Sequence, residues 1–148
     1  MTNKILKAEQ LGRQVSRVPR LWRAILDERL APLGLTQTRW MTLYCLYKGH
    51  QGSVQRELAS VVGVEAPSLV RTLNQLASQG LIERRTCGGD RRSKRIYLTH
   101  KAAPLLQKIQ DVVSQSRLEM LEGLDEDEVE QLVALMTRID TNCQNLLK

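Results

Sequence analysis

The sequence contains no phenylalanine, and only 3% of its residues are aromatic. A hydrophobic core in this chain of 148 residues must therefore be built from leucine, isoleucine, valine, methionine and alanine. A chain of this length is expected to form one domain, spanning residues 1–148. No apolar run approaches the roughly 20 residues that cross a bilayer, and the first seven residues lack the apolar stretch of a secretory signal. We therefore expect a cytoplasmic protein with no membrane partner.

Cysteine and histidine are also scarce. Three cysteines are odd in number and widely spaced, which argues against a disulfide framework and against a zinc site. The two histidines are far apart, and no glycine-rich phosphate motif occurs. The acidic run 122–130 lacks the alternating ligands and the central glycine of a calcium loop, so we interpret it as a solvated turn and helix start. These absences predict no enzyme activity, no metal and no cofactor.

Positive charge is concentrated in the middle of the chain. Residues 65–101 carry eight Lys and Arg against three Asp and Glu, whereas residues 102–148 carry four against nine. Phosphate contacts supply most of the non-specific affinity for nucleic acid, so the basic stretch predicts a face that binds a polyanion. The alternative is that these charges only solvate a surface. Their clustering on one helix and one hairpin favours DNA binding.

Apolar spacing before the basic stretch predicts a series of helices. The first ends near Pro32 and Gly34, and Thr36 is placed to cap a second helix over residues 37–47. Ser53 is placed to cap a third, with Gly63 at its C-terminal end. A helix that follows after only a few residues gives the spacing of a helix-turn-helix. The inward-facing residues expected in the second and third helices are Trp40, Leu43, Tyr44, Tyr47, Leu58, Val61 and Val62.

The fourth predicted helix, within the run 65–81, is amphipathic. Leu69, Val70, Leu73 and Leu76 form its apolar face, and Pro67 suits an early helical position. Short hydrogen-bonding side chains on the other face can reach base edges and phosphates in a major groove. The predicted DNA-binding residues of this helix are Pro67, Ser68, Arg71, Thr72 and Gln75.

A basic hairpin follows this helix. Alternating residues predict one strand over 81–86 and a return strand over 95–99, and two glycines at 88 and 89 suit the tip. A recognition-like helix followed by a basic hairpin is the order found in winged helix-turn-helix proteins. The hairpin residues expected to contact double-stranded DNA are Arg84, Arg85, Asp90, Arg91, Arg92, Lys94 and Arg95, with Arg84, Arg85, Lys94 and Arg95 assigned to the DNA backbone.

The two ends of the chain carry long apolar stripes that a lobe of about 70 residues cannot bury. We therefore expect residues 8–33 and 102–148 to form dimerisation helices, because a symmetric dimer also suits a reader of two half-sites. Asp125 and Glu128 form an approximate capping box at the last helix. The alternative is that these stripes pack only within the monomer.

Four segments resemble the MarR family of transcription factors, and more narrowly its SlyA-like branch: residues 35–40, 55–59, 66–73 and 90–96. The resemblance implies a mainly α (α+β) fold, with a winged helix-turn-helix lobe over 36–101. It further implies a homodimer on a near-palindromic promoter site, associated with the nucleoid. Arg92 is the residue expected in the minor groove, and Asp90 is either the ion-pair partner of Arg71 or of a neighbouring hairpin arginine, or a simple hairpin-tip residue.

The resemblance also implies a small aromatic carboxylate as effector, bound by Arg20, Trp40 and Tyr44. Plain core packing of the two aromatic residues is the alternative. Cys87 stands beside several arginines, which would favour its thiolate and a redox role, although an exposed hairpin cysteine can also be incidental. For the whole chain, the competing function is a winged-helix module that binds another protein and not DNA.

Overall fold

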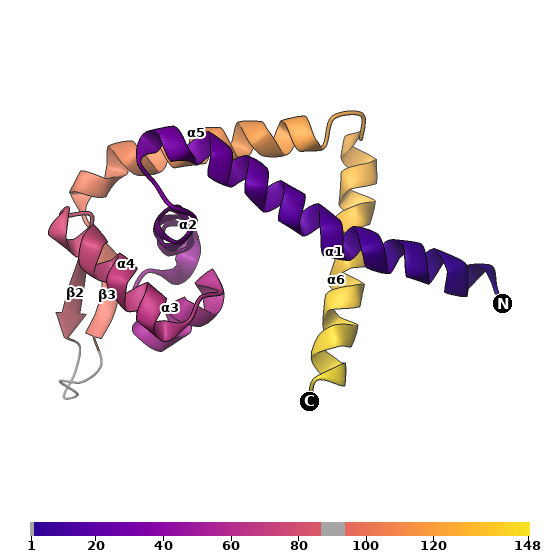
Figure 1. The fold of residues 1–148 in the computed structure, drawn as a ribbon, viewed down its shortest axis with the longest axis horizontal. Coiled ribbons are helices and arrows are strands. Elements are labelled where there is room, and N and C mark those ends of the chain that lie inside the picture. Colours follow the sequence, from indigo (N-terminus) through magenta and orange to yellow (C-terminus); the bar gives the residue numbers. More distant parts are fainter. Residues whose placement is uncertain (1, 87–93) are drawn as a thin grey trace. The chain divides into compact units, whose positions relative to one another are not determined.

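The computed structural model describes residues 2–86 and 94–148 (Figure 1). These residues form six α-helices and a three-stranded antiparallel sheet. The mainly helical winged-helix fold expected from the sequence is therefore confirmed. The chain divides into two compact units, Met1–Ser114 and Gln115–Lys148. The boundaries 36–101, 8–33 and 102–148 drawn from the sequence remain predictions.

The first helix, α1 (Asn3–Leu30), is 28 residues long and begins at Thr2, whose hydroxyl accepts a hydrogen bond from the Ile5 amide. It ends in a 3-10 turn, Ala31–Leu33, closed by Gly34 in the left-handed conformation. Only Leu26 and Leu30 of α1 are buried. Most of its apolar stripe is thus exposed in the single chain.

The helix-turn-helix begins with α2 (Gln37–Cys45), which Thr36 caps as predicted by accepting from the Arg39 amide. It continues through α3 (Gln55–Val62), which ends at Gly63 with φ +82, again as predicted. The prediction for Ser53 was wrong. It does not cap α3 but forms strand β1 (Ser53–Val54), because Ser53 pairs with Ile96 of a strand 40 residues further along.

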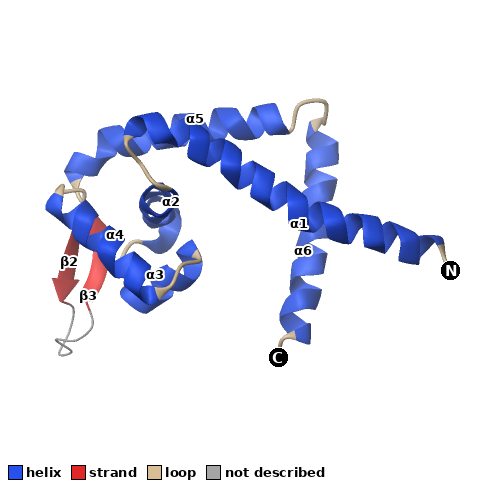
Figure 2. Ribbon diagram, in the orientation of Figure 1, coloured by secondary structure: helices blue, strands red, loops and turns tan. Residues whose placement is uncertain are grey.

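The recognition-like helix α4 (Ala66–Ser78) leads into β2 (Ile82–Thr86), which pairs with β3 (Lys94–Leu98). The strand order is β1-β3-β2, with both pairs antiparallel. Figure 2 shows β2 and β3 side by side. Directly opposed residues share a face of the sheet, so Arg84 lies on the same face as Ile96. The opposite face carries the pairs Glu83–Tyr97 and Arg85–Arg95.

The core of the first unit is mainly aliphatic, with Trp40 as a buried aromatic residue. Two residues expected in it are exposed, Tyr47 and Val61. Tyr47 lies where the helical segment that follows α2 ends, because the next two residues, Lys48 and Gly49, leave the helical conformation. The centre of its exposed ring lies 5.4 Å from Nζ of Lys48. In α3, Ala59 packs inward beside Leu58 in place of Val61. The largest fully buried side chains are Leu30, Leu43, Leu46, Leu58, Leu69, Leu73, Leu76, Ile96, Ile109, Val113, Thr42 and Ser116.

The second unit contains the end of α5 (Ala103–Met120), a turn and α6 (Glu126–Leu146). The predicted capping box is confirmed, since Asp125 accepts from the Glu128 amide at 2.8 Å and Glu128 accepts from the Asp125 amide at 3.0 Å. No residue of α6 is buried. The exposed apolar residues of α6 include Leu132, Val133, Leu135, Met136, Ile139 and Leu146.

Candidate nucleic-acid interface

The outer face of α4 is polar and accessible. Pro67 occupies the first helical turn as predicted, and Arg71 and Gln75 are exposed. Ser68 is half-buried in the first turn. Two further polar residues, Asn74 and Ser78, share this exposed face and were not selected from the sequence. Helical spacing alone could have identified them, because they lie three and seven residues after Arg71.

Thr72 is the exception among the selected residues. It is only 6% exposed, so it belongs to the buried side of α4 and not to the polar face. At 100° per residue it lies about 60° from Leu69, closer to the apolar stripe than to Arg71. The placement of Thr72 on the polar face was therefore wrong, and its contact with DNA stays a prediction.

Arg71 has no side-chain partner within residues 2–86 and 94–148. Its guanidinium carries five N–H donors, and none of them is engaged by a described residue. The N-cap residue of α4, Glu65, makes no side-chain capping hydrogen bond. The first-turn amides of α4 thus lack a side-chain acceptor, which suits the approach of an anion.

Arg84 is held within the molecule. Its Nη2 donates to Oδ1 of Asn74 at 2.8 Å, linking β2 to the exposed face of α4. Its position on the sheet face that carries Ile96 and Ile82 explains why its side chain is half-buried. The structure therefore gives Arg84 an intramolecular partner where the sequence suggested a contact with the DNA backbone.

Arg85 and Arg95 oppose each other on the outer face of the sheet, and each is held by a different group. Arg85 pairs with Glu83, its Nε lying 2.7 Å from Oε1, and stacks over the ring of Tyr97 at 4.1 Å. Arg95 donates to the carbonyl oxygen of Gly52 at 2.8 Å. These partners separate two like charges that would otherwise repel.

Gly52 is required where it stands. Its φ of +83° is strained for other residues, and an added Cβ would come within 3.2 Å of the Tyr97 hydroxyl. The loop before β1 can therefore approach β3 closely enough for Arg95 to reach it.

Lys94 is exposed at the start of β3, where it remains available to a ligand. The other hairpin residues selected from the sequence lie outside the described residues: Cys87, Asp90, Arg91 and Arg92. The structure thus describes the predicted interface residues that belong to α4, β2 and β3.

Arg39 connects α2 to the far end of α4. Its Nη1 donates to the Gly34 carbonyl at 3.1 Å, and its Nη2 donates to Oε1 of Gln79, the residue that ends α4. No local pattern in the sequence gives Arg39 this role, because Gln79 is 40 residues away. This bridge fixes the C-terminal end of the helix whose outer face is the candidate interface.

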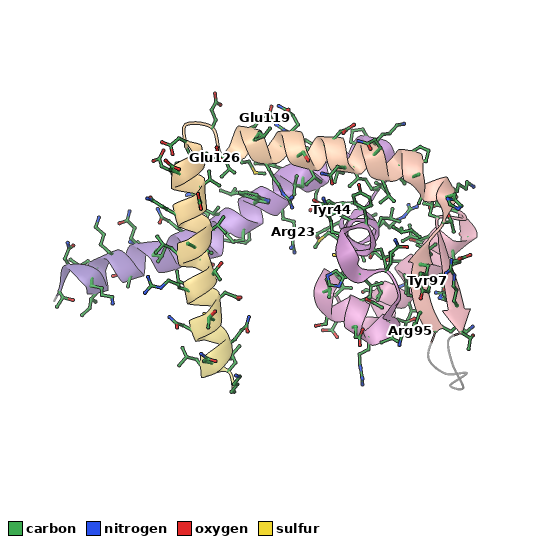
Figure 3. The ribbon with its side chains drawn as sticks, turned by 180° about the vertical axis from the view of Figure 1, so that it is seen from behind. Arg23, Tyr44, Arg95, Tyr97, Glu119 and Glu126 are labelled. Carbon is green, nitrogen blue, oxygen red and sulfur yellow. The ribbon has the colours of Figure 1, made fainter. Side chains whose placement is uncertain are left out.

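The predicted effector residues are only partly brought together. Trp40 and Tyr44 are in edge-to-face contact with ring centroids 6.3 Å apart, and Trp40 is buried with its indole N–H donated to Asp27. Arg20 instead donates to the Ser16 carbonyl on its own helix. The arginine of α1 that acts on α2 is Arg23 (Figure 3), a residue the sequence did not select.

Cys45 lies within reach of the charge of Arg23. Burial raises the pKa of the Cys45 thiol, and the guanidinium of Arg23 opposes this shift. Burial is the larger effect, so Cys45 is a poor nucleophile near neutral pH. In the part of the chain that the structure describes, no group of three His, Cys, Asp or Glu side chains could hold a metal ion. None of the described helices could cross a membrane.

Comparison with known proteins agrees with this geometry. The MarR family model matches residues 35–94, which contain α2 through β2 and the first residue of β3. A solved transcriptional regulator, PA3341, is 42% identical over 91% of this chain and 98% of its own, with a TM-score of 0.84. These matches define a winged-helix regulator, and the chain belongs to the MarR family of transcriptional regulators.

Two other solved structures are similar over most of their length. The transcriptional regulator SlyA is 25% identical, covering 91% of this chain and 94% of that one, with a TM-score of 0.77. A mutant of MarR from E. coli, solved in complex with operator DNA, is 27% identical over 93% of this chain and 99% of that one, with a TM-score of 0.73.

Proposed function

We propose that this protein is a homodimer that binds near-palindromic promoter DNA in a sequence-specific manner. The observation that carries the proposal is the outer face of α4, where Arg71, Asn74 and Gln75 are exposed and Arg71 has no partner among the described residues. A helix with such a face can enter a major groove and present donors to base edges. The solved complex of E. coli MarR with operator DNA supports the same use of this fold.

The dimer follows from surface that the single chain leaves open. The apolar stripes of α1 and α6 are exposed, and contiguous apolar surface of this extent marks an association site in a water-soluble protein. A two-fold dimer would bury both stripes and present two copies of α4 to successive major grooves. Arg92, outside the described residues, would enter the minor groove beside each half-site, as its position in the hairpin sequence suggests.

The proposal also includes a small-molecule effector and membership of the SlyA-like branch. A small aromatic carboxylate could bind near Tyr44, where Lys48 lies 5.7 Å from the ring and Arg23 carries a second positive charge. Assignment to the SlyA-like branch rests on the resemblance of residues 66–73 and 90–96. A regulator of this kind would act in the cytoplasm, on the nucleoid.

Equilibrium binding measured across a salt series tests the proposal. Fluorescence anisotropy would compare a duplex selected from a random library with a scrambled duplex of the same composition. We expect affinity for the selected duplex to exceed that for the scrambled one by about 1,000-fold or more, with both falling steeply as salt rises. A folded dimer that binds neither duplex would contradict the proposal and favour the protein-interaction module.

A further inference from the structure

We propose that Asn74 is a specificity-determining residue that presents only its amide N–H donors to the DNA, and that Arg84 is the positioning residue that orients it. The inference deepens the proposed function and rests on it. It also reassigns Arg84, which the sequence suggested as a contact to the DNA backbone.

The orientation of the Asn74 amide follows from the chemistry of its partner. Arginine has five N–H donors and no acceptor, so the group that faces Arg84 must be the carbonyl oxygen, Oδ1. The 2.8 Å distance from Arg84 Nη2 to Asn74 Oδ1 is that of a well-formed hydrogen bond. The Nδ2 amide group then points away from β2, on the exposed side of α4.

The location of Asn74 makes this orientation useful. It lies three residues after Arg71 and four before Ser78, so the three side chains are neighbours along one exposed stripe of α4. Within the described residues, Nδ2 of Asn74 has no partner. A free asparagine could rotate and read either a donor or an acceptor, whereas the guanidinium of Arg84 fixes one of the two choices.

The base edges that fit a fixed donor are limited. In the major groove, guanine offers N7 and O6, thymine offers O4 and adenine offers N7, whereas cytosine presents the N4 amino donor. Asn74 should therefore favour an acceptor and disfavour cytosine at one position of each half-site. Phosphate oxygen is also an acceptor, and binding to scrambled DNA separates that alternative from base reading.

Arg84 is poorly placed to neutralise a phosphate while it holds Asn74. It is half-buried on the face of the sheet that carries Ile82 and Ile96, and its guanidinium is already engaged. A phosphate contact would have to come from its remaining donors, on a side chain that is half-buried and oriented toward Asn74. Arg84 should therefore contribute to sequence preference and little to the salt dependence of binding, which counts phosphates neutralised.

A double-mutant cycle on the full-length dimer tests this assignment. Kd would be measured on the selected duplex, on the scrambled duplex and on duplexes with each half-site position substituted in turn. Asn74→Ala should weaken binding to the selected duplex about 10-fold and flatten the base preference at one symmetric position. Arg84→Ala should weaken it by a smaller factor, about 3-fold, and should have no further effect in the Asn74→Ala background.

Three variants sharpen the test. Asn74→Asp keeps an acceptor for Arg84 but replaces the donor with oxygen, so it should bind the selected duplex more weakly than Asn74→Ala does and should shift preference toward cytosine. Arg84→Lys keeps the charge and provides a second variant should Arg84→Ala fold poorly. Arg138→Ala, on α6, removes one exposed positive charge outside the lobe and serves as the matched control.

The salt slope distinguishes the outcomes. Arg84→Ala should leave the slope equal to that of Arg138→Ala, whereas a phosphate contact would lower it by about one unit. Additive effects of Arg84→Ala and Asn74→Ala together with a lowered slope would overturn the assignment. So would an Asn74→Asp variant that binds as well as the wild type. If the wild type fails to discriminate the selected from the scrambled duplex, the proposed function itself fails, and this inference fails with it.

Discussion

Trp40 donates its indole N–H to a carboxylate oxygen of Asp27 over 2.8 Å, and this hydrogen bond joins α2 to α1. Trp40 is buried and Asp27 is half-buried. Because Asp27 belongs to the helix that carries an exposed apolar stripe, and Trp40 to the first helix of the DNA-binding lobe, the bond connects the two functional parts of the first unit.

Replacing the indole N–H donor of Trp40 should lower the stability of the fold. Trp40→Phe keeps an aromatic ring but leaves the Asp27 carboxylate without its hydrogen bond, and we expect a loss of about 2 kcal/mol in the free energy of unfolding. Urea denaturation at fixed protein concentration measures it. Tyr47→Phe is the matched control, since Tyr47 is exposed, and it should change stability by less than about 0.5 kcal/mol. Equal stability of the two variants would show that the hydrogen bond contributes little.

Removing Arg71 should affect specificity, whereas removing Lys94 should affect overall affinity. Arg71→Ala is expected to cost about 1–3 kcal/mol on the preferred duplex and to relax base preference there. Lys94→Ala should weaken binding to all sequences evenly and reduce the salt slope by about one unit. Anisotropy titrations on selected and scrambled duplexes separate the two. If Arg71→Ala lowers both affinities equally, Arg71 holds a phosphate and does not read a base.

A charge placed on the apolar stripe of α6 should dissociate the dimer. Met136 is 44% exposed in the single chain, so Met136→Glu would cost little there but would bury an unpaired carboxylate at the proposed dimer interface. We expect the dimer to dissociate at about 100-fold higher protein concentration or more. Sedimentation velocity over a dilution series measures this shift.

Thr141→Glu provides the control for that experiment. It adds the same charge to α6 on the side away from the apolar stripe, about 140° around the helix axis from Met136 and about 120° from Leu135. It should leave the dimer intact. Dissociation by both variants, or by neither, would contradict the proposed use of this stripe.

The two described cysteines should differ in reactivity. Burial raises the pKa of the Cys45 thiol and so lowers its thiolate fraction at pH 7.5, whereas Cys143 is exposed to the reagent. In a Cys87→Ser background, iodoacetamide should label Cys143 before Cys45, as followed by peptide mass spectrometry. Labelling of Cys45 and Cys143 at equal rates would contradict the effect of burial.

The same shift has a consequence for stability. A folded-state pKa above the unfolded value means that the native state binds the Cys45 proton more tightly. The contribution of this proton to the free energy of unfolding is therefore fully present below the unfolded-state pKa. It decreases as the pH rises through the folded-state pKa. Cys45→Ala should flatten this alkaline loss in urea titrations between neutral and alkaline pH.

The sequence predicted those features that depend on local pattern. The period of Leu69, Leu73 and Leu76 identified α4, and the capping residues Thr36 and Asp125 identified where helices begin. It failed for β1, because a strand of two residues exists only through pairing with Arg95 and Ile96. No local pattern at Ser53 distinguishes a helix cap from that pairing.

The candidate interface shows the same limit. Exposure of Arg71 and Gln75 was predictable from helical spacing, whereas the burial of Thr72 depends on where the edge of the apolar stripe lies. The link between Arg84 and Asn74 joins a strand to a helix ten residues earlier. Such a contact depends on how β2 packs against α4. The sequence alone shows only that Arg84 is positively charged and does not reveal its partner.

The central claim is that two copies of α4 read two symmetric half-sites. In vitro selection from a library of random duplexes, using the wild-type dimer and sequencing after each round, tests it most directly. We expect enrichment of an inverted repeat whose half-site centres are about 10 base pairs apart, or a multiple of one helical turn. Enrichment of a single asymmetric motif, or no enrichment by a folded dimer, would contradict it.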